Sequence, residues 1–383
     1  MNIRCFIVLY FVFCNIAHAN TTLEARKLFS RLTGKTATIH DLRIAQMANL
    51  LDNNDPKSAA LIAINDIDYY DITLRGFASR LISIEDDPYI KLNDSISLLI
   101  GLAKDKDDFR KYLYGDVLYV PLKSASNNEE VIPSNNFAFN NFEKSGKSII
   151  KNIVKRSPQW NISSGSYSYT DFAGVFTTRG WARIYYEAGT NRRSVKGAMN
   201  SFLCAPIDSW KNTSLPDYRI RRDVDRLPGG NYQTFQKTCR GCHAPMDAMG
   251  GAFANLNFLS SFGGVIQLGL KPEFKYNKND DIYPDGYITL DSSWINFLDD
   301  ENYQKRFGWK EKFQGETLQE YGKMLATSKA FTKCMTQKTL KHICKKDFSL
   351  NSDIVEGLSK KFTESKFKLN SLFVEAAIHD KCN

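Results

Sequence analysis

Residues 239–243 read Cys-Arg-Gly-Cys-His, and this spacing constrains the chain more than any other feature of its sequence. Two thiols three residues apart lie on one side of a helical turn, and an imidazole follows directly. Such thiols can form thioethers with both vinyl groups of one porphyrin, while the imidazole binds the iron from the same side. Chance alone produces this pattern in roughly two chains per thousand of this composition. We therefore expect Cys239 and Cys242 to hold one covalent haem c, with His243 as the proximal iron ligand.

Two other uses of the cysteine pair stay open. A structural zinc site needs further ligands, and the other histidines beyond the N-terminal segment are His40, His342 and His379. A thioredoxin-like redox site needs a preceding strand in a βαβ setting, which the flanking sequence does not indicate. Both uses are therefore weaker hypotheses than haem attachment.

The first nineteen residues have the pattern of a secretory signal peptide. They contain one positive charge at Arg4, an apolar run over 5–13, and small residues at Ala17 and Ala19. The alternative is an uncleaved membrane anchor, but the apolar run is shorter than a bilayer requires. We expect cleavage before Asn20 and a mature protein that is periplasmic or extracellular, where covalent haem attachment takes place.

Export also determines how many cysteines remain and how they are expected to pair. Cleavage would remove two of the eight and leave six. Unpaired thiols are uncommon in an oxidising compartment, so the four cysteines outside the motif are expected to form two disulfides. Three pairings are open, and the favoured pairs are Cys204 with Cys334 and Cys344 with Cys382.

The ligand on the opposite side of the iron is less constrained. A methionine there would raise the reduction potential. Met199, Met324 and Met335 are each distant enough along the chain from His243 to reach the other side, and Met324 or Met335 is the favoured candidate. His342 and His379 are further candidates, and a five-coordinate iron also stays open. A methionine buried in a helical core is the more common role for each of the methionines.

The pattern of apolar residues predicts a mainly α fold. Helical periodicity dominates residues 21–116, and the last third of the chain again reads as helices. Short β-favouring runs and turn residues in 263–293 predict a small β-hairpin insertion. The expected organisation is a signal peptide (1–19), a helical N-terminal module (20–122), a linker (123–140), and a cytochrome c-like haem-binding region with a helical closing domain (141–383).

The net charge of +9 is spread along the chain. Basic runs such as "RRSVK" (192–196) are short or interrupted by acidic and apolar residues, which favours a solvated surface over a nucleic-acid interface. The expected partner is a redox protein of the cell envelope and not a nucleic acid. The basic surface also allows peripheral contact with a membrane.

Several segments resemble one known family. "TCRGCHAPMDAMGGAFANLNF" (238–258), "AGVFTTRGWARIYYEAGTNRRSVKGAMNSFLCAPI" (173–207) and "FQGETLQEYGKMLATSKAFTKCMTQKTLKHICKKD" (313–347) are similar, in the same order, to blocks of the planctomycete-type cytochrome c-like proteins. The resemblance covers about residues 172–380. It implies a haem on the motif and supports a Cys204–Cys334 disulfide. It also places Asp247 on a family aspartate, which we interpret as supporting the turn or the histidine. Ala248 and Gly251 depart from the family pattern, in which a proline and an aromatic residue occur.

No other catalytic motif accompanies the haem motif, and one Cys-x-x-Cys-His means one covalent haem. The function expected from the sequence is electron transfer. The alternatives are a haem enzyme or sensor with an open iron position, and an envelope binding protein whose haem is structural.

Overall fold

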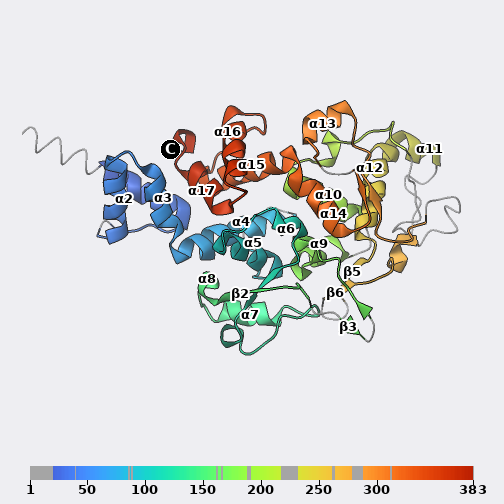
Figure 1. Ribbon diagram of the computed structural model, residues 1–383, viewed down its shortest axis with the longest axis horizontal. Helices are drawn as coiled ribbons and strands as arrows, with labels where there is room; N and C mark the ends of the chain where they lie inside the picture. The colour runs from blue at the N-terminus through green and yellow to red at the C-terminus, as the bar shows by residue number, and fades with distance from the viewer. Residues whose placement is uncertain are drawn as a thin grey trace, which may run out of the picture. The chain divides into compact units, whose positions relative to one another are not determined.

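The computed structural model describes residues 20–38, 40–84, 87, 89–160, 163–164, 167–187, 191–216, 232–260, 264–277, 288–310 and 313–382. The signal peptide predicted for residues 1–19 lies outside these ranges. Within them the fold is mainly helical, with a few short strands (Figure 1). This confirms the mainly α fold with a small β-hairpin that the sequence predicts.

The chain forms two compact units. The first contains the described residues up to Phe77 and from Thr336 onward, and the second runs from Ala78 to Met335. The linker predicted for 123–140 lies inside the second unit, where it contains the 3-10 helix η2 (Lys123–Ala125) and the beginning of helix α7 (Phe137–Lys144).

The first unit joins the two ends of the chain. Helix α17 (Leu369–Ala377) packs on helix α3 (Pro56–Ile64), and Phe373 of α17 contacts Tyr69 and Phe77 edge to face, at 5.7 and 5.2 Å between ring centres. The disulfide Cys344–Cys382 closes the C-terminal segment onto helix α15. The other elements are helix 20–33, α2 (Leu42–Asp52), the π-helix η1 (Tyr69–Leu74), the beginning of α4 (Arg75–Ile82), the end of α15 (Lys329–Cys344), α16 (Asp353–Glu364) and the 3-10 helix η10 (Asp380–Cys382).

The second unit is built around an aromatic core. Phe176 contacts Trp181, Phe202 and Phe253 at 5.2–5.8 Å between ring centres. The disulfide Cys204–Cys334 links the end of α10 to α15. The helices are α5 (Asp94–Lys104), α6 (Lys111–Tyr114), α8 (Ile149–Asn152), η3 (Gly174–Thr177), α9 (Arg179–Tyr185), α10 (Asn191–Leu203), η5 (Ile207–Ser209), α11 (Tyr232–Thr234), η6 (Phe235–Cys239), α12 (Arg240–Gly250), η7 (Gly251–Phe253), η9 (Phe274–Asn277), α13 (Glu301–Phe307) and α14 (Leu318–Thr327).

The strands form small antiparallel pairs. Strand β5 (Leu256–Leu259) pairs with β6 (Val265–Leu268), so the predicted hairpin is present but begins upstream of residue 263. Residues 278–287 of the predicted hairpin region lie outside the described residues. The other pairs are β1 (Leu118–Pro121) with β2 (Ile153–Arg156), β3 (Ser163–Ser164) with β4 (Tyr167–Ser168), and β7 (Trp294–Ile295) with β8 (Gln314–Gly315).

The segment "NFEKSGKSIIKNIVKRS" (141–157) has a helical pattern in the sequence, but its residues 153–156 form strand β2. Ile153 and Val154 are β-branched and lose side-chain freedom in a helix. They pair instead with Pro121 and Val120 of β1. Pairing with a strand more than thirty residues away therefore overrides the local helical pattern.

In the part of the chain that the structure describes, no helix is both long enough and apolar enough to cross a membrane.

Replacing two helical glycines with alanine is expected to change the free energy of unfolding in opposite directions. A Cβ on Gly101 of α5 would overlap the ring of Tyr119, whereas a Cβ on Gly357 of α16 would meet no atom within 4 Å. We expect Gly101→Ala to reduce the free energy of unfolding by about 1–3 kcal/mol, and Gly357→Ala to raise it by about 0.5–1 kcal/mol through helix propensity. Urea denaturation of both variants measures this, and equal effects of the two would contradict the packing of α5 against β1.

Candidate functional site

Helix α12 carries the Cys-x-x-Cys-His motif. The chain enters it through the π-helical turn η6, so Cys239 ends that turn while Cys242 and His243 lie in the first turn of α12. π-Helical turns are rare and occur frequently at functional sites. The motif therefore begins where the π-helical turn η6 changes to the α-helix α12.

Pro245 changes the hydrogen bonding of this helix. Proline has no N–H to donate to the carbonyl oxygen four residues earlier, which belongs to Gly241. The backbone N–H of Asn212 donates to that oxygen instead, at 2.7 Å. A Cβ on Gly241 would lie only 3.1 Å from Cγ2 of Thr213, so glycine permits this close approach. Asn212 and Thr213 are therefore held against the motif.

The three motif side chains are each partly exposed, at a spacing that places them on one face of a helix. Cys239 and Cys242 are free and of intermediate exposure, and the His243 side chain is 22% exposed. The rest of the helix, from Ala244 to Gly250, is buried. A haem bound through two thioethers and an imidazole needs these three groups on one open side, and the residues fit this requirement.

A buried ion pair lies behind His243. Asp247, one turn further along α12, is 1% exposed. Arg192 of α10, itself 11% exposed, binds both of its oxygens, through Nε at 2.5 Å and Nη2 at 3.1 Å. Nδ1 of His243 lies 3.7 Å from Oδ2 of Asp247. Burial raises the pKa of Asp247, but Arg192 and His243 outweigh it and hold the pKa below its usual value. The ion pair with Arg192 therefore favours the charged form of this buried carboxyl group.

Charged residues before the motif change the pKa of the Cys242 thiol. Burial raises the pKa of its thiol, while Lys211 opposes this effect and Asp208 adds to it. A nucleophilic cysteine is normally activated by a lowered pKa. The pKa of Cys242 therefore shifts in the direction opposite to that expected of a catalytic thiolate.

The two candidate distal ligands are core residues. Met324 of α14 and Met335 of α15 are fully buried. The sulfur of Met324 accepts a hydrogen bond from the side-chain amide of Asn296 at 3.4 Å. Either methionine as a distal iron ligand stays a prediction.

The histidines considered as zinc ligands, His40, His342 and His379, belong to the first unit, whereas the motif belongs to the second. Nε2 of His342 lies 3.0 Å from the carbonyl oxygen of Thr73. Over the described ranges, no three His, Cys, Asp or Glu side chains gather as one metal ion requires.

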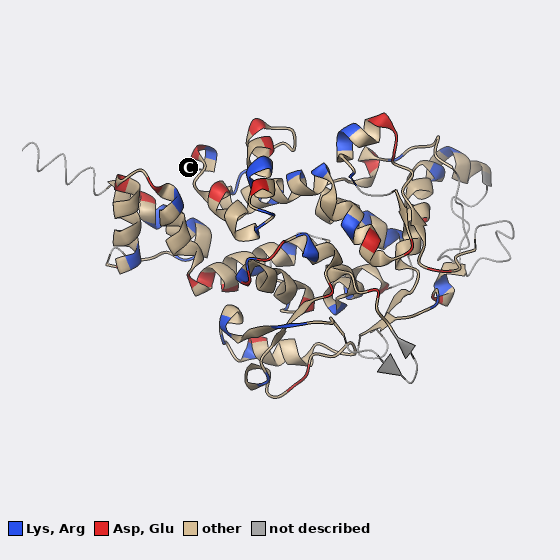
Figure 2. Cartoon of the chain, viewed as in Figure 1, with Lys and Arg blue, Asp and Glu red and all other residues tan. Residues whose placement is uncertain are grey.

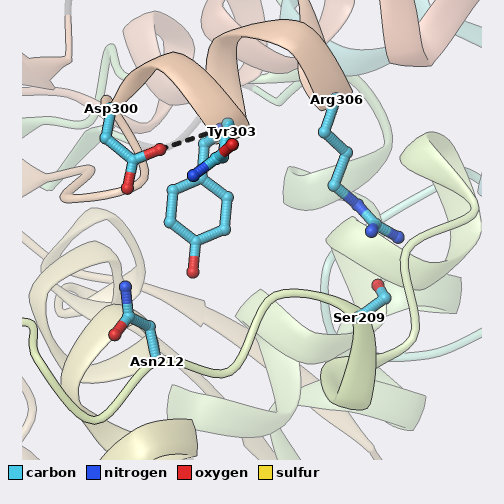
Figure 3. A pocket seen from close by; sticks show the side chains of 6 residues that line it. Ser209, Asn212, Asp300, Tyr303 and Arg306 are labelled. Atoms are coloured by element: carbon cyan, nitrogen blue, oxygen red, sulfur yellow. Dashed lines mark hydrogen bonds between the residues drawn. The ribbon is translucent and has the colours of Figure 1, made fainter.

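A polar pocket of about 260 Å³ lies near the motif (Figure 3). Asn212, whose backbone bonds to Gly241, forms one wall, and helix α13 forms the other. Oδ1 of Asp300 caps α13 by accepting the N–H of Tyr303 at 3.0 Å, and the Tyr303 hydroxyl donates to the carbonyl oxygen of Trp210 at 3.3 Å. These bonds fix α13 against the segment that precedes the motif. The lining residues are Ser209, Asn212, Asp300, Asn302, Tyr303 and Arg306.

Arg192 is the site residue that sequence reasoning missed. It belongs to the basic run 192–196, which we expected to be solvated. The structure instead buries its side chain against Asp247, 55 residues away. The resemblance of the segment 173–207 to a family block was the one signal that pointed to this region.

No protein-family model, curated protein or solved structure matches this chain. The resemblance to planctomycete-type cytochrome c-like proteins therefore stays a prediction, and the function has to be argued from the residues.

Removal of Arg192 is expected to destabilise the protein strongly. Arg192→Met would leave the buried Asp247 carboxylate without its bidentate partner, and we expect a loss of about 3–5 kcal/mol in the free energy of unfolding. Lys211→Met breaks an exposed pair with Asp208, whose side chain is 81% exposed. We expect this control to leave the free energy of unfolding almost unchanged, because an exposed ion pair contributes little to stability. Chemical denaturation compares the two, and a small loss for Arg192→Met would contradict a structural role for the buried pair.

Proposed function

We propose that this protein is an exported c-type cytochrome-like protein that binds one covalent haem and transfers electrons. One observation carries the proposal. Cys239, Cys242 and His243 present two free thiols and an imidazole on the open side of one helical turn. The other described cysteines are all joined in disulfides.

Each residue of the motif has a distinct task in this proposal. The haem supplies one-electron chemistry when bound. Cys239 and Cys242 would hold it as thioethers, and His243 would bind the iron through Nε2. The buried remainder of α12 gives these three residues a rigid base, because Ala244–Gly250 are enclosed by the second unit. The proposed site is thus built on a helix and not on a loop.

The disulfides support the proposed periplasmic or extracellular location. Disulfides persist in oxidising compartments and are rare in the cytosol. Cys204–Cys334 and Cys344–Cys382 are the two pairs expected from the sequence for an exported chain. The predicted signal peptide would direct the export.

The proposed partner is a redox protein of the cell envelope. Lys and Arg are interspersed with Asp and Glu on the helices (Figure 2). Several of the cations are paired, as in Lys57 with Glu375 and Lys111 with Asp107. This mixed surface supports docking to a protein rather than binding along a nucleic-acid backbone. Membership of the planctomycete-type cytochrome c-like family is part of the same proposal.

One observation favours a second function, that of a haem enzyme or sensor. The sulfur of Met324 already accepts a hydrogen bond from Asn296 in the core. If Met324 keeps this contact when haem is bound, one of the two methionine candidates is lost as a distal ligand. If Met335 also stays in the core, where it is fully buried, the iron keeps an open position that would serve catalysis or sensing rather than electron transfer.

Covalent attachment can be measured directly. We expect the protein exported from cells with a cytochrome c maturation system to gain the mass of one haem and to give a c-type pyridine haemochrome spectrum. Cys239→Ser with Cys242→Ser should abolish covalent haem, because both thioethers are lost. The matched control is Cys344→Ser with Cys382→Ser, which also removes two cysteines and should retain the haem. Wild-type protein without covalent haem would contradict the proposal.

The optical spectrum separates the two functions. Electron transfer predicts a low-spin, six-coordinate iron that reacts slowly with carbon monoxide, because both axial positions are filled. Met324→Leu and Met335→Leu, tested separately, should identify the distal ligand by conversion to a high-spin spectrum. A wild-type protein that is already high-spin and binds carbon monoxide rapidly would favour the enzyme or sensor.

A further inference from the structure

The imidazole of His243 has one nitrogen inside the protein. Its Nδ1 is buried, and in the described part of the chain no group lies within hydrogen-bond distance of it. Buried polar atoms nearly always have a partner, so an unpaired one calls for an explanation. The haem-binding role proposed for the ring uses its other nitrogen and does not explain Nδ1.

Asp247 is placed to interact with this nitrogen. It lies four residues after His243 on the same face of α12, and its Oδ2 is 3.7 Å from Nδ1. That distance exceeds a hydrogen bond. It still leaves the ionised carboxylate as a close charge on the buried side of the ring. The ring of Phe235 meets the His243 ring edge to face, at 5.6 Å between centres.

Arg192 fixes the carboxylate in this place. A carboxylate that is 1% exposed is costly unless it is paired and hydrogen-bonded. Arg192 supplies two hydrogen bonds from α10, one to each oxygen. The guanidinium holds the carboxylate plane, so Oδ2 cannot turn away from His243 without breaking one of these bonds.

We propose that Asp247, clamped by Arg192, is a positioning residue that orients His243 through Nδ1 and strengthens Nε2 as an iron ligand, which lowers the reduction potential of the bound haem. The inference rests on the proposed haem function and deepens it. A carboxylate held 3.7 Å from Nδ1 favours the tautomer that carries its proton on Nδ1, and its negative charge increases electron donation at the other nitrogen. Stronger donation favours the ferric over the ferrous state.

A purely structural role for the pair makes a different prediction. If Arg192 and Asp247 only joined α10 to α12, replacing Asp247 would change stability and leave the electronic properties of the iron unaltered. The experiment therefore has to measure the iron–histidine bond as well as the potential. It also needs a control that removes a nearby negative charge without touching His243.

Asp208 provides that control. It lies in the segment that packs against the motif, yet its side chain is exposed and paired with Lys211. Asp208→Asn and Asp247→Asn each remove one negative charge near the motif. They differ in that only Asp247 lies behind the imidazole.

The test uses the exported holoprotein as wild type, Asp247→Asn, Asp247→Glu, Arg192→Gln and Asp208→Asn. Covalent haem content is measured first, then the reduction potential, and then the iron–histidine stretching band by resonance Raman spectroscopy after photolysis of the carbon monoxide complex. For Asp247→Asn we expect the oxidised-to-reduced equilibrium to shift about tenfold toward the reduced form, which is about 59 mV for one electron. The stretching band should fall in frequency.

The other variants test the direction in which the potential and the stretching band change. Arg192→Gln removes both hydrogen bonds that hold the carboxylate beside His243, so the potential and the stretching band should move in the same direction as in Asp247→Asn. Asp247→Glu keeps a carboxylate for Arg192 and therefore keeps the test open if Asp247→Asn does not fold. Asp247→Glu should recover part of the wild-type band, while Asp208→Asn should leave the band unchanged.

Two outcomes separate the failure of this inference from that of the proposed function. Holoprotein with intact covalent haem, in which Asp247→Asn and Asp208→Asn shift the potential equally and neither moves the stretching band, overturns the inference alone. Wild-type protein that carries no covalent haem overturns both.

Discussion

The buried ion pair between Arg192 and Asp247 connects the two helices on which the candidate site depends. It joins α10 to α12, and these two helices pack against each other. Because the carboxylate is almost fully enclosed, it is stable only while both hydrogen bonds from the guanidinium persist. The same constraint places a fixed negative charge behind His243. A single interaction thus contributes to packing and to the electronic surroundings of the proposed iron ligand.

Pro245 determines the backbone hydrogen bonding around the motif. A proline inside a helix leaves one carbonyl oxygen without its intrahelical donor. Asn212 supplies the missing N–H, and this brings the segment before the motif against Gly241. The same segment lines the polar pocket with α13 and carries Lys211, which acts on Cys242. The local chemistry of the motif is therefore coupled to a part of the chain about thirty residues upstream.

The described cysteines fall into two groups, four that stabilise the fold as disulfides and two that are free for the proposed function. Each compact unit has its own disulfide, one closing the C-terminal segment and one joining α10 to α15. The disulfides restrict the unfolded chain and so favour the folded state. Cys239 and Cys242 stay outside this framework, as free thiols in a partly exposed turn. This division is what the haem proposal requires, because thioether formation consumes both thiols. In this proposal, a distal ligand on the iron would favour electron transfer, and an open distal position would favour catalysis or sensing.

The amino-acid sequence by itself determined the features that depend on short spacing. Helical periodicity predicted the mainly α fold, the five-residue motif predicted which side chains share one turn, and the motif left four cysteines for two disulfides. Tertiary structure alone decided the rest. Residues 153–156 became a strand because a distant partner strand was present, and Arg192 left the expected solvated face because Asp247, 55 residues later, needed a buried cation. Such outcomes depend on which segments meet in space, and local patterns in the sequence do not encode that.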